Sequence, residues 1–228
     1  MTKTTSGRHT VIKGPRRILS SPPMIKVSGS ARRAFTFPAE LPVAYAYYAD
    51  VGRVLSYLPR ICLVRAYGPD RYRLVYRSTE LGVYHVRIFA DVQSRLEEGW
   101  VLRIAPLNSS TPPLCGADAC TMSTQGFFAS RSAFYDQGER TRIEYALKLW
   151  GDLPTPRELR FMPGFMVDRI AATITRMRMD EIVSRFIERS IDAFPDWLAE
   201  MQNHSAWPDL SQAQALTVPV PDCPEEHP

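Results

Sequence analysis

The chain has 228 residues, of which 45% are hydrophobic and 23% charged, and its formal net charge is +4. This composition is typical of an ordinary globular domain with extensions, and it excludes a membrane-spanning helix because no apolar run reaches about 18 residues. The four cysteines are too few for a disulfide scaffold at this length, so we expect a reducing, cytoplasmic setting.

Charge is distributed unevenly along the chain. There is no acidic residue before Glu40, whereas residues 1–30 carry several lysines and arginines. Residues 203–228 are acidic and rich in proline, and neither end shows a periodic apolar pattern. We therefore expect a basic flexible arm over residues 1–30, a folded domain over 31–202 and a Pro-rich acidic flexible tail over 203–228.

The domain begins with a strand at residues 33–37, which Pro38 closes. Two short helical patterns follow at residues 40–50 and 53–58, separated by a break at Asp50-Val51-Gly52 and ended by Pro59. A second strand is expected at residues 61–67.

The next segments alternate between apolar and charged residues. This pattern predicts antiparallel strands with one buried face and one solvated face. The apolar rows are Tyr72, Leu74 and Tyr76; then Tyr84, Val86, Ile88, Ala90 and Val92; then Trp100, Leu102 and Ile104; and, last, Ile143, Tyr145, Leu147 and Leu149. A bent strand is expected between residues 119 and 135, around Gly126.

From Phe165 to Met201 the apolar residues recur every three to five positions, with charges between them. This spacing predicts a long amphipathic helix, and Pro195 should bend it in its last third. The helix is the element long enough to cover the apolar face of the sheet, and the two short helices would close the end that it leaves open.

This order resembles the helix-grip fold of the START/Bet v 1-like (SRPBCC, polyketide cyclase-like) superfamily. The resemblance rests on "FTFPAELPVAYAYYADVGRVLSYLPRI" and on the terminal helix, and it is greatest to an uncharacterised branch that has similar Leu153-Pro154 and Met162-Pro163 motifs. It implies an α+β fold with about seven strands curved around the long C-terminal helix.

Few residues suggest chemistry. His9, His204 and His227 fall in the expected tails and His85 stands alone on a polar strand face, so we predict no metal site and no cofactor. There is no nucleophile motif and no phosphate-binding glycine loop. We assign no catalytic residue, because the apolar sheet face offers only Tyr hydroxyls as acids or bases.

The aromatic residues on the buried face are the main candidates for a binding site, because a buried Tyr hydroxyl needs a polar partner. Either these side chains form a packed core or they line a cavity, and the resemblance favours a cavity under the long helix. The predicted ligand-binding residues are Tyr76, Tyr84, Trp100, Phe128, Tyr145, Leu147, Ile170 and Ile174.

The sequence thus favours binding or carriage of a hydrophobic small molecule, such as a lipid, isoprenoid quinone or pigment-like compound. One alternative is a non-enzymatic scaffold that docks through its basic arm and an Arg-rich sheet face; another is a cyclase- or aromatase-like enzyme using the same cavity. Residues 1–33 are the expected contact with an anionic membrane surface or a protein partner, whereas nucleic acid is disfavoured. The protein is expected in the cytoplasm, either free or peripheral to a membrane.

Overall fold

A computed structural model describes residues 24–107 and 121–203. Its helices and strands are, in chain order, β1 (Met24–Phe37), α1 (Leu41–Ala49), α2 (Val51–Ser56), β2 (Ile61–Ala66), β3 (Arg71–Glu80), β4 (Tyr84–Glu97), β5 (Val101–Pro106), β6 (Thr121–Asp136), β7 (Thr141–Pro154), the 3-10 turn η1 (Arg157–Leu159), α3 (Gly164–Asp192) and α4 (Phe194–Asn203).

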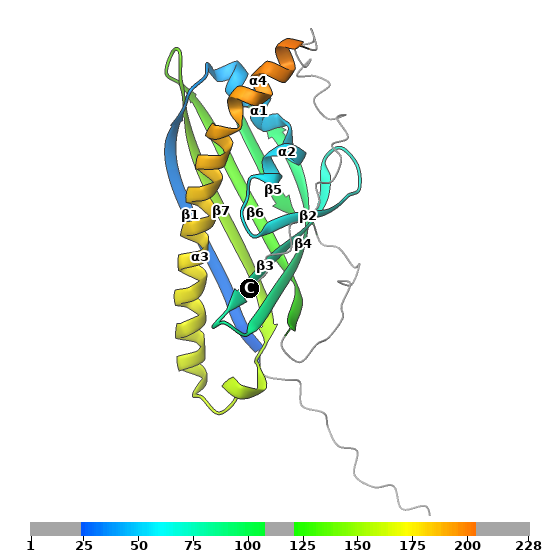
Figure 1. The fold of residues 1–228 in the computed structure, drawn as a ribbon, viewed down its shortest axis with the longest axis vertical. Helices are drawn as coiled ribbons and strands as arrows, with labels where there is room; N and C mark the ends of the chain where they lie inside the picture. The colour runs from blue at the N-terminus through cyan, green and yellow to red at the C-terminus, as the bar shows by residue number, and fades with distance from the viewer. Residues whose placement is uncertain (1–23, 108–120, 204–228) are drawn as a thin grey trace, which may run out of the picture.

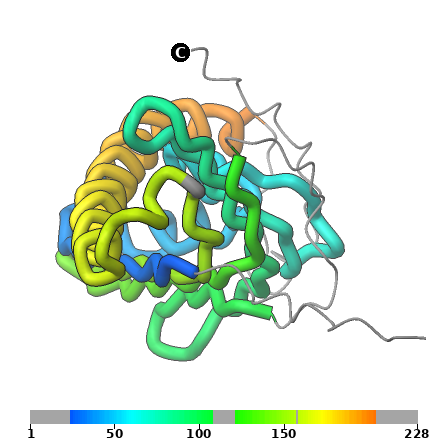
Figure 2. The backbone as a smooth tube through the Cα atoms, turned by 90° about the horizontal axis from the view of Figure 1, so that it is seen from below, coloured from blue at the N-terminus to red at the C-terminus, as the bar shows by residue number. Residues whose placement is uncertain are grey.

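The seven strands form one sheet in the order β1-β7-β6-β5-β4-β3-β2. Neighbours pair antiparallel, and the start of β4 (His85–Phe89) also pairs in parallel with the start of β6 (Thr121–Gln125), beyond the end of the shorter β5. The sheet curls around its interior, and α3 runs along the open side (Figures 1 and 2). The predicted α+β helix-grip fold is confirmed.

The alternating rows face as predicted. Val86, Ile88 and Leu147 are buried on the side that α3 covers, whereas Arg87 and Lys148 are exposed on the other side. Helix α3 has 29 residues, which corresponds to about 44 Å. It stops at Ala193, and α4 begins at Phe194, because Pro195 lacks an amide hydrogen and fits only the first turn of a helix.

The helix pair α1 and α2 lies at the upper end of the molecule, beside α4 (Figure 1). Asp50 separates the two helices and accepts a hydrogen bond from the Arg53 amide at 3.2 Å, which caps α2. The break is therefore shorter than predicted, since Val51 and Gly52 are already helical.

Strand β1 is longer than the predicted strand at 33–37, and its first seven residues belong to the segment that the sequence analysis assigned to the flexible arm. Met24 to Phe37 pair in register with Pro154 to Thr141 of β7. Small residues hide this strand in the sequence, and Gly29 is required at its position: a Cβ atom there would lie 2.5 Å from side-chain atoms of Thr175 and Met179. Gly29 thus lets α3 approach the sheet closely.

Residues 1–23 of the expected arm and residues 204–228 of the expected tail lie outside the described residues. Within the described ranges, none of the helices combines the length and the apolar character needed to cross a bilayer. Cys62, in β2, is disulfide-bonded. The sequence analysis did not expect a disulfide here.

Candidate functional site

The interior between the sheet and α3 has two parts, and the upper one is filled by aromatic rings. Phe37 contacts Tyr47, Tyr48 and Phe194 with ring centroids 4.8–5.5 Å apart, and Trp197 lies 5.2 Å from Tyr47. The Tyr47 hydroxyl donates to the Ser190 carbonyl at 2.8 Å, and the Tyr48 hydroxyl bonds the Ser190 hydroxyl at 2.9 Å. These contacts leave the upper part closed.

The lower part contains a partly open pocket under the first half of α3, with about 100 Å³ of free space. A water molecule needs roughly 10–15 Å³ of such space, so the pocket has room for several waters or the end of an apolar chain. The walls are aliphatic for the most part. They include Ile25 and Val27 from β1, Val86 and Ile88 from β4, Leu149 and Leu153 from β7, and Val167, Ile170 and Ile174 from α3.

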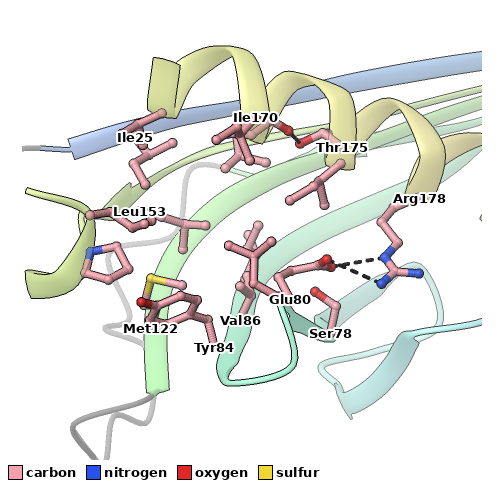
Figure 3. A pocket seen from close by; sticks show the side chains of 18 of the residues that line it. Ile25, Ser78, Glu80, Tyr84, Val86, Met122, Leu153, Ile170, Thr175 and Arg178 are labelled. Atoms are coloured by element: carbon pink, nitrogen blue, oxygen red, sulfur yellow. Dashed lines mark hydrogen bonds and ion pairs between the residues drawn. The ribbon is translucent and has the colours of Figure 1, made fainter. Parts of the chain in front are cut away.

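Polar side chains gather on one side of this pocket, where the β3–β4 hairpin meets α3 (Figure 3). Arg178 donates to both carboxylate oxygens of Glu80, from Nε at 3.1 Å and from Nη2 at 3.3 Å, and from Nη1 to Glu181 at 3.0 Å. Ser78 lies next to this ion pair on the same face of β3. We call Ser78, Glu80 and Arg178 the polar corner.

The electrostatics of the polar corner follow from these bonds. Hydrogen bonding to Glu80 raises the pKa of Arg178, although burial opposes the shift. Burial also acts to raise the pKa of Glu181, but the bonds to Arg178 and Arg60 outweigh it and hold the Glu181 pKa below its ordinary value. The positive and negative charges are therefore matched within the network.

A second contact joins the hairpin to the opposite wall. The Tyr84 hydroxyl donates to Glu158 of η1 at 3.3 Å. Apolar side chains near this end are exposed to solvent, among them Leu81 on the hairpin, Phe161 before α3 and Phe165 in its first turn. Phe161 is 93% exposed. The pocket end thus carries several exposed apolar side chains.

Four of the eight predicted ligand-binding residues, Tyr76, Tyr84, Ile170 and Ile174, line this pocket. The other four lie elsewhere. Trp100 is in the β4–β5 turn with a φ of 58°, is 39% exposed and packs against Tyr45. Phe128, Tyr145 and Leu147 are buried in the packed core, where Tyr145 stacks on Phe186 at 4.6 Å.

The sequence analysis missed the polar corner, although the pattern contained it. Ser78 and Glu80 follow Tyr76 at intervals of two, so they share its strand face, and Arg178 follows Ile174 by four, so it shares its helix face. The statement that the buried face offers only Tyr hydroxyls was therefore wrong. Most of the missed lining residues are aliphatic, and nothing in the sequence separates them from core residues.

In the described part of the chain, no cluster of three or more His, Cys, Asp or Glu side chains could hold a metal ion. Burial raises the pKa of Tyr76, which lines the pocket. The site therefore consists of an apolar pocket with one compact group of polar side chains.

No protein-family model and no curated protein sequence matches the chain. Solved structures do match. A START superfamily protein from Mycobacterium smegmatis is 10% identical with a TM-score of 0.42, over 74% of this chain and 98% of that chain. The Zhui aromatase/cyclase from Streptomyces sp. R1128 is 12% identical with a TM-score of 0.42, over 80% and 98%.

Human STARD10 is 10% identical with a TM-score of 0.47, over 82% of this chain and 72% of that chain. At these identities and scores the likeness assigns no ligand or activity to this chain. Its helix-grip fold is defined by the element order and sheet topology in Figure 1.

Proposed function

We propose that the protein binds a hydrophobic small molecule in the pocket between α3 and the sheet. The observation that carries this proposal is the pocket itself: free space with aliphatic walls, beside a core that is otherwise closely packed. Apolar pockets with a few convergent polar groups are the usual sites for such ligands. A lipid, an isoprenoid quinone or a pigment-like compound would bury its apolar part against Ile170, Ile174 and Leu153.

The enzyme alternative has less support. The polar corner holds a carboxylate, but both oxygens of Glu80 already accept hydrogen bonds from Arg178. A general base must be able to reach and take a proton from its substrate. Arg178 holds both carboxylate oxygens of Glu80 in an ion pair, so this arrangement favours binding over catalysis.

The scaffold alternative and the cellular location stay predictions. Most of the basic arm lies outside the described residues, so its contact with an anionic membrane or a protein partner is a separate proposal. Cell fractionation with an antibody against the protein would test the expected cytoplasmic location.

The binding proposal can be tested with a matched pair of variants. Ala171 lines the pocket, whereas its neighbour Ala172 is exposed on the outer side of α3. The probe is N-phenyl-1-naphthylamine, a neutral apolar dye that fluoresces on burial. We expect saturable binding to the wild type, at least about tenfold weaker binding to Ala171→Phe, and unchanged binding to Ala172→Phe.

Circular dichroism and thermal unfolding would show that both variants fold. The proposal fails if the wild type does not bind the dye, or if Ala171→Phe and Ala172→Phe bind it equally well. Native mass spectrometry of the purified protein, followed by lipid and pigment extraction, would then identify the natural ligand.

A further inference from the structure

The Ser78 hydroxyl is a buried polar group without a hydrogen bond. Ser78 is 7% exposed and lines the pocket, and its Oγ atom makes no hydrogen bond within the residues that the structure describes. The Tyr76 hydroxyl is its neighbour on the strand face, but the two do not meet hydrogen-bond geometry. Leaving a buried hydroxyl without a partner costs free energy, so such a group calls for an explanation.

The charges beside Ser78 restrict which ligand group could form the missing hydrogen bond. Of the lining residues that the structure describes, Arg178 alone carries a positive charge. Its Nε and Nη2 atoms are bonded to Glu80 and its Nη1 atom to Glu181. A ligand carboxylate or phosphate would have to displace Glu80 or lie beside it, and like charges in a poorly solvated site repel strongly.

A neutral hydroxyl fits the same place. Its oxygen can accept a hydrogen bond from Ser78, and its hydrogen can be donated to Glu80, since each carboxylate oxygen has a second lone pair beyond the one used by Arg178. Figure 3 shows the Ser78 and Glu80 side chains next to each other. Aliphatic side chains from β1, β4 and α3 line the rest of the pocket. A ligand complementary to this pocket has an apolar body and a single polar end.

We propose that the ligand of this pocket is a neutral alcohol: an apolar body carrying a hydroxyl group that lies between Ser78 and Glu80, and not a free fatty acid or another anionic amphiphile. This inference rests on the proposed function, because it names the ligand class of the same pocket. It assigns Ser78 and Glu80 as the residues that determine specificity and Arg178 as the residue that positions Glu80.

The test compares three ligands of similar length as competitors of N-phenyl-1-naphthylamine: decan-1-ol, decyl methyl ether and decanoate. The ether can accept a hydrogen bond from Ser78 but cannot donate one to Glu80. We expect decan-1-ol to bind about fivefold more tightly than the ether and at least about tenfold more tightly than decanoate at pH 7.

The variant Ser78→Ala should weaken decan-1-ol about fivefold. It should also leave the melting temperature unchanged or raised, because it removes an unpaired buried hydroxyl. Replacing a serine that only supports the fold would lower the melting temperature and leave the affinity for decan-1-ol unchanged. The matched control is Thr175→Val, which also removes a hydroxyl from the pocket wall. The Thr175 hydroxyl already donates to the Ala171 carbonyl at 2.7 Å, so the ligand preference should not change.

Each outcome decides between the two proposals. Equal or tighter binding of decanoate, or an unchanged preference for decan-1-ol in Ser78→Ala, overturns the alcohol assignment and leaves the binding function intact. If the dye binds but decan-1-ol does not displace it, the alcohol assignment fails alone. If the dye does not bind the wild type, the binding function fails and the alcohol assignment fails with it.

Discussion

The two ends of the interior are covered by the same helix, yet they are built differently. At the upper end, flat rings from β1, α1, α3 and α4 contact each other edge to face or stacked, and two Tyr hydroxyls are bonded to Ser190. At the lower end, aliphatic side chains from the sheet and the helix face each other across free space. The large aromatic residues therefore indicate the closed end of the molecule, and the walls of the cavity are mostly aliphatic.

This difference has a physical basis. Aromatic rings bury a large area each and gain extra energy from edge-to-face contacts, so they fill the space between widely separated elements. Branched aliphatic side chains are shorter and do not reach across the same gap. Substitutions at matched positions in the two ends should show how much of the stability each end supplies.

The largest effect is expected at Phe186, which is fully buried and packs against Tyr48 and Tyr145. Phe186→Ala should lower the free energy of unfolding by about 3–5 kcal/mol, because it leaves a cavity among rings that cannot collapse. Denaturant unfolding measures this loss. Phe165→Ala, at an exposed position on the same helix, should change stability by less than about 0.5 kcal/mol. Similar losses at the two positions would contradict the closed packing of the upper end.

A second pair compares the same change in both ends. Ile182 is fully buried in the packed part of α3, whereas Ile174 borders the pocket eight residues earlier. Ile182→Ala should cost about 2–5 kcal/mol, and Ile174→Ala less than about 1.5 kcal/mol because Ile174 already borders empty space. Chemical denaturation of both variants tests this order, and a larger loss at Ile174 would show that the pocket is filled in solution.

The Tyr48 hydroxyl gives a smaller effect. Tyr48→Phe removes its hydrogen bond to Ser190 and should destabilise the fold by about 1 kcal/mol. The loss stays small because Ser190 keeps its own bond to the Ile187 carbonyl at 2.9 Å. Thermal unfolding at several scan rates would measure it. An equally large effect of Tyr135→Phe, at an exposed position, would count against this assignment.

The smallest effect concerns pH and the polar corner. The pKa of Glu181 in the folded protein lies below its unfolded value of about 4.3. The ionised side chain therefore stabilises the fold fully above that pH, and this stabilisation is lost as the pH falls through the folded pKa. Glu181→Gln should therefore cost about 0.5 kcal/mol at pH 7 and less near pH 3. Urea unfolding at both pH values measures the difference. A cost that does not depend on pH would mean that the charge of Glu181 contributes nothing.

Much of the fold could be predicted from the sequence, because strand alternation and helix periodicity are local signals. Two features escaped. The first half of β1 contains Ser28-Gly29-Ser30. These small residues interrupt the alternation of apolar and polar residues where Gly29 contacts α3. Trp100 continues an alternating row but lies in a turn, since Gly99 and Trp100 both have positive φ angles.

The candidate site was predictable only in part. Tyr76 and Ile174 follow from facing rules, and the same rules would have given Ser78 and Arg178. Whether Tyr145 meets a ring or an empty space depends on which helix residue lies opposite it, here Phe186. That pairing joins residues far apart in the chain, and no local pattern in the sequence encodes it.

The way α3 is attached has a mechanical consequence. The helix is held close to the sheet at Thr175 and Met179 by their approach to Gly29, and at Arg178 by the hydrogen bonds to Glu80. The eleven residues from Gly164 to Ile174 extend about 16 Å beyond these contacts. If this segment tilted as a rigid body by about 10°, its first turn would move about 3 Å from the sheet, so entry of a ligand larger than the pocket would need only a small displacement of the helix.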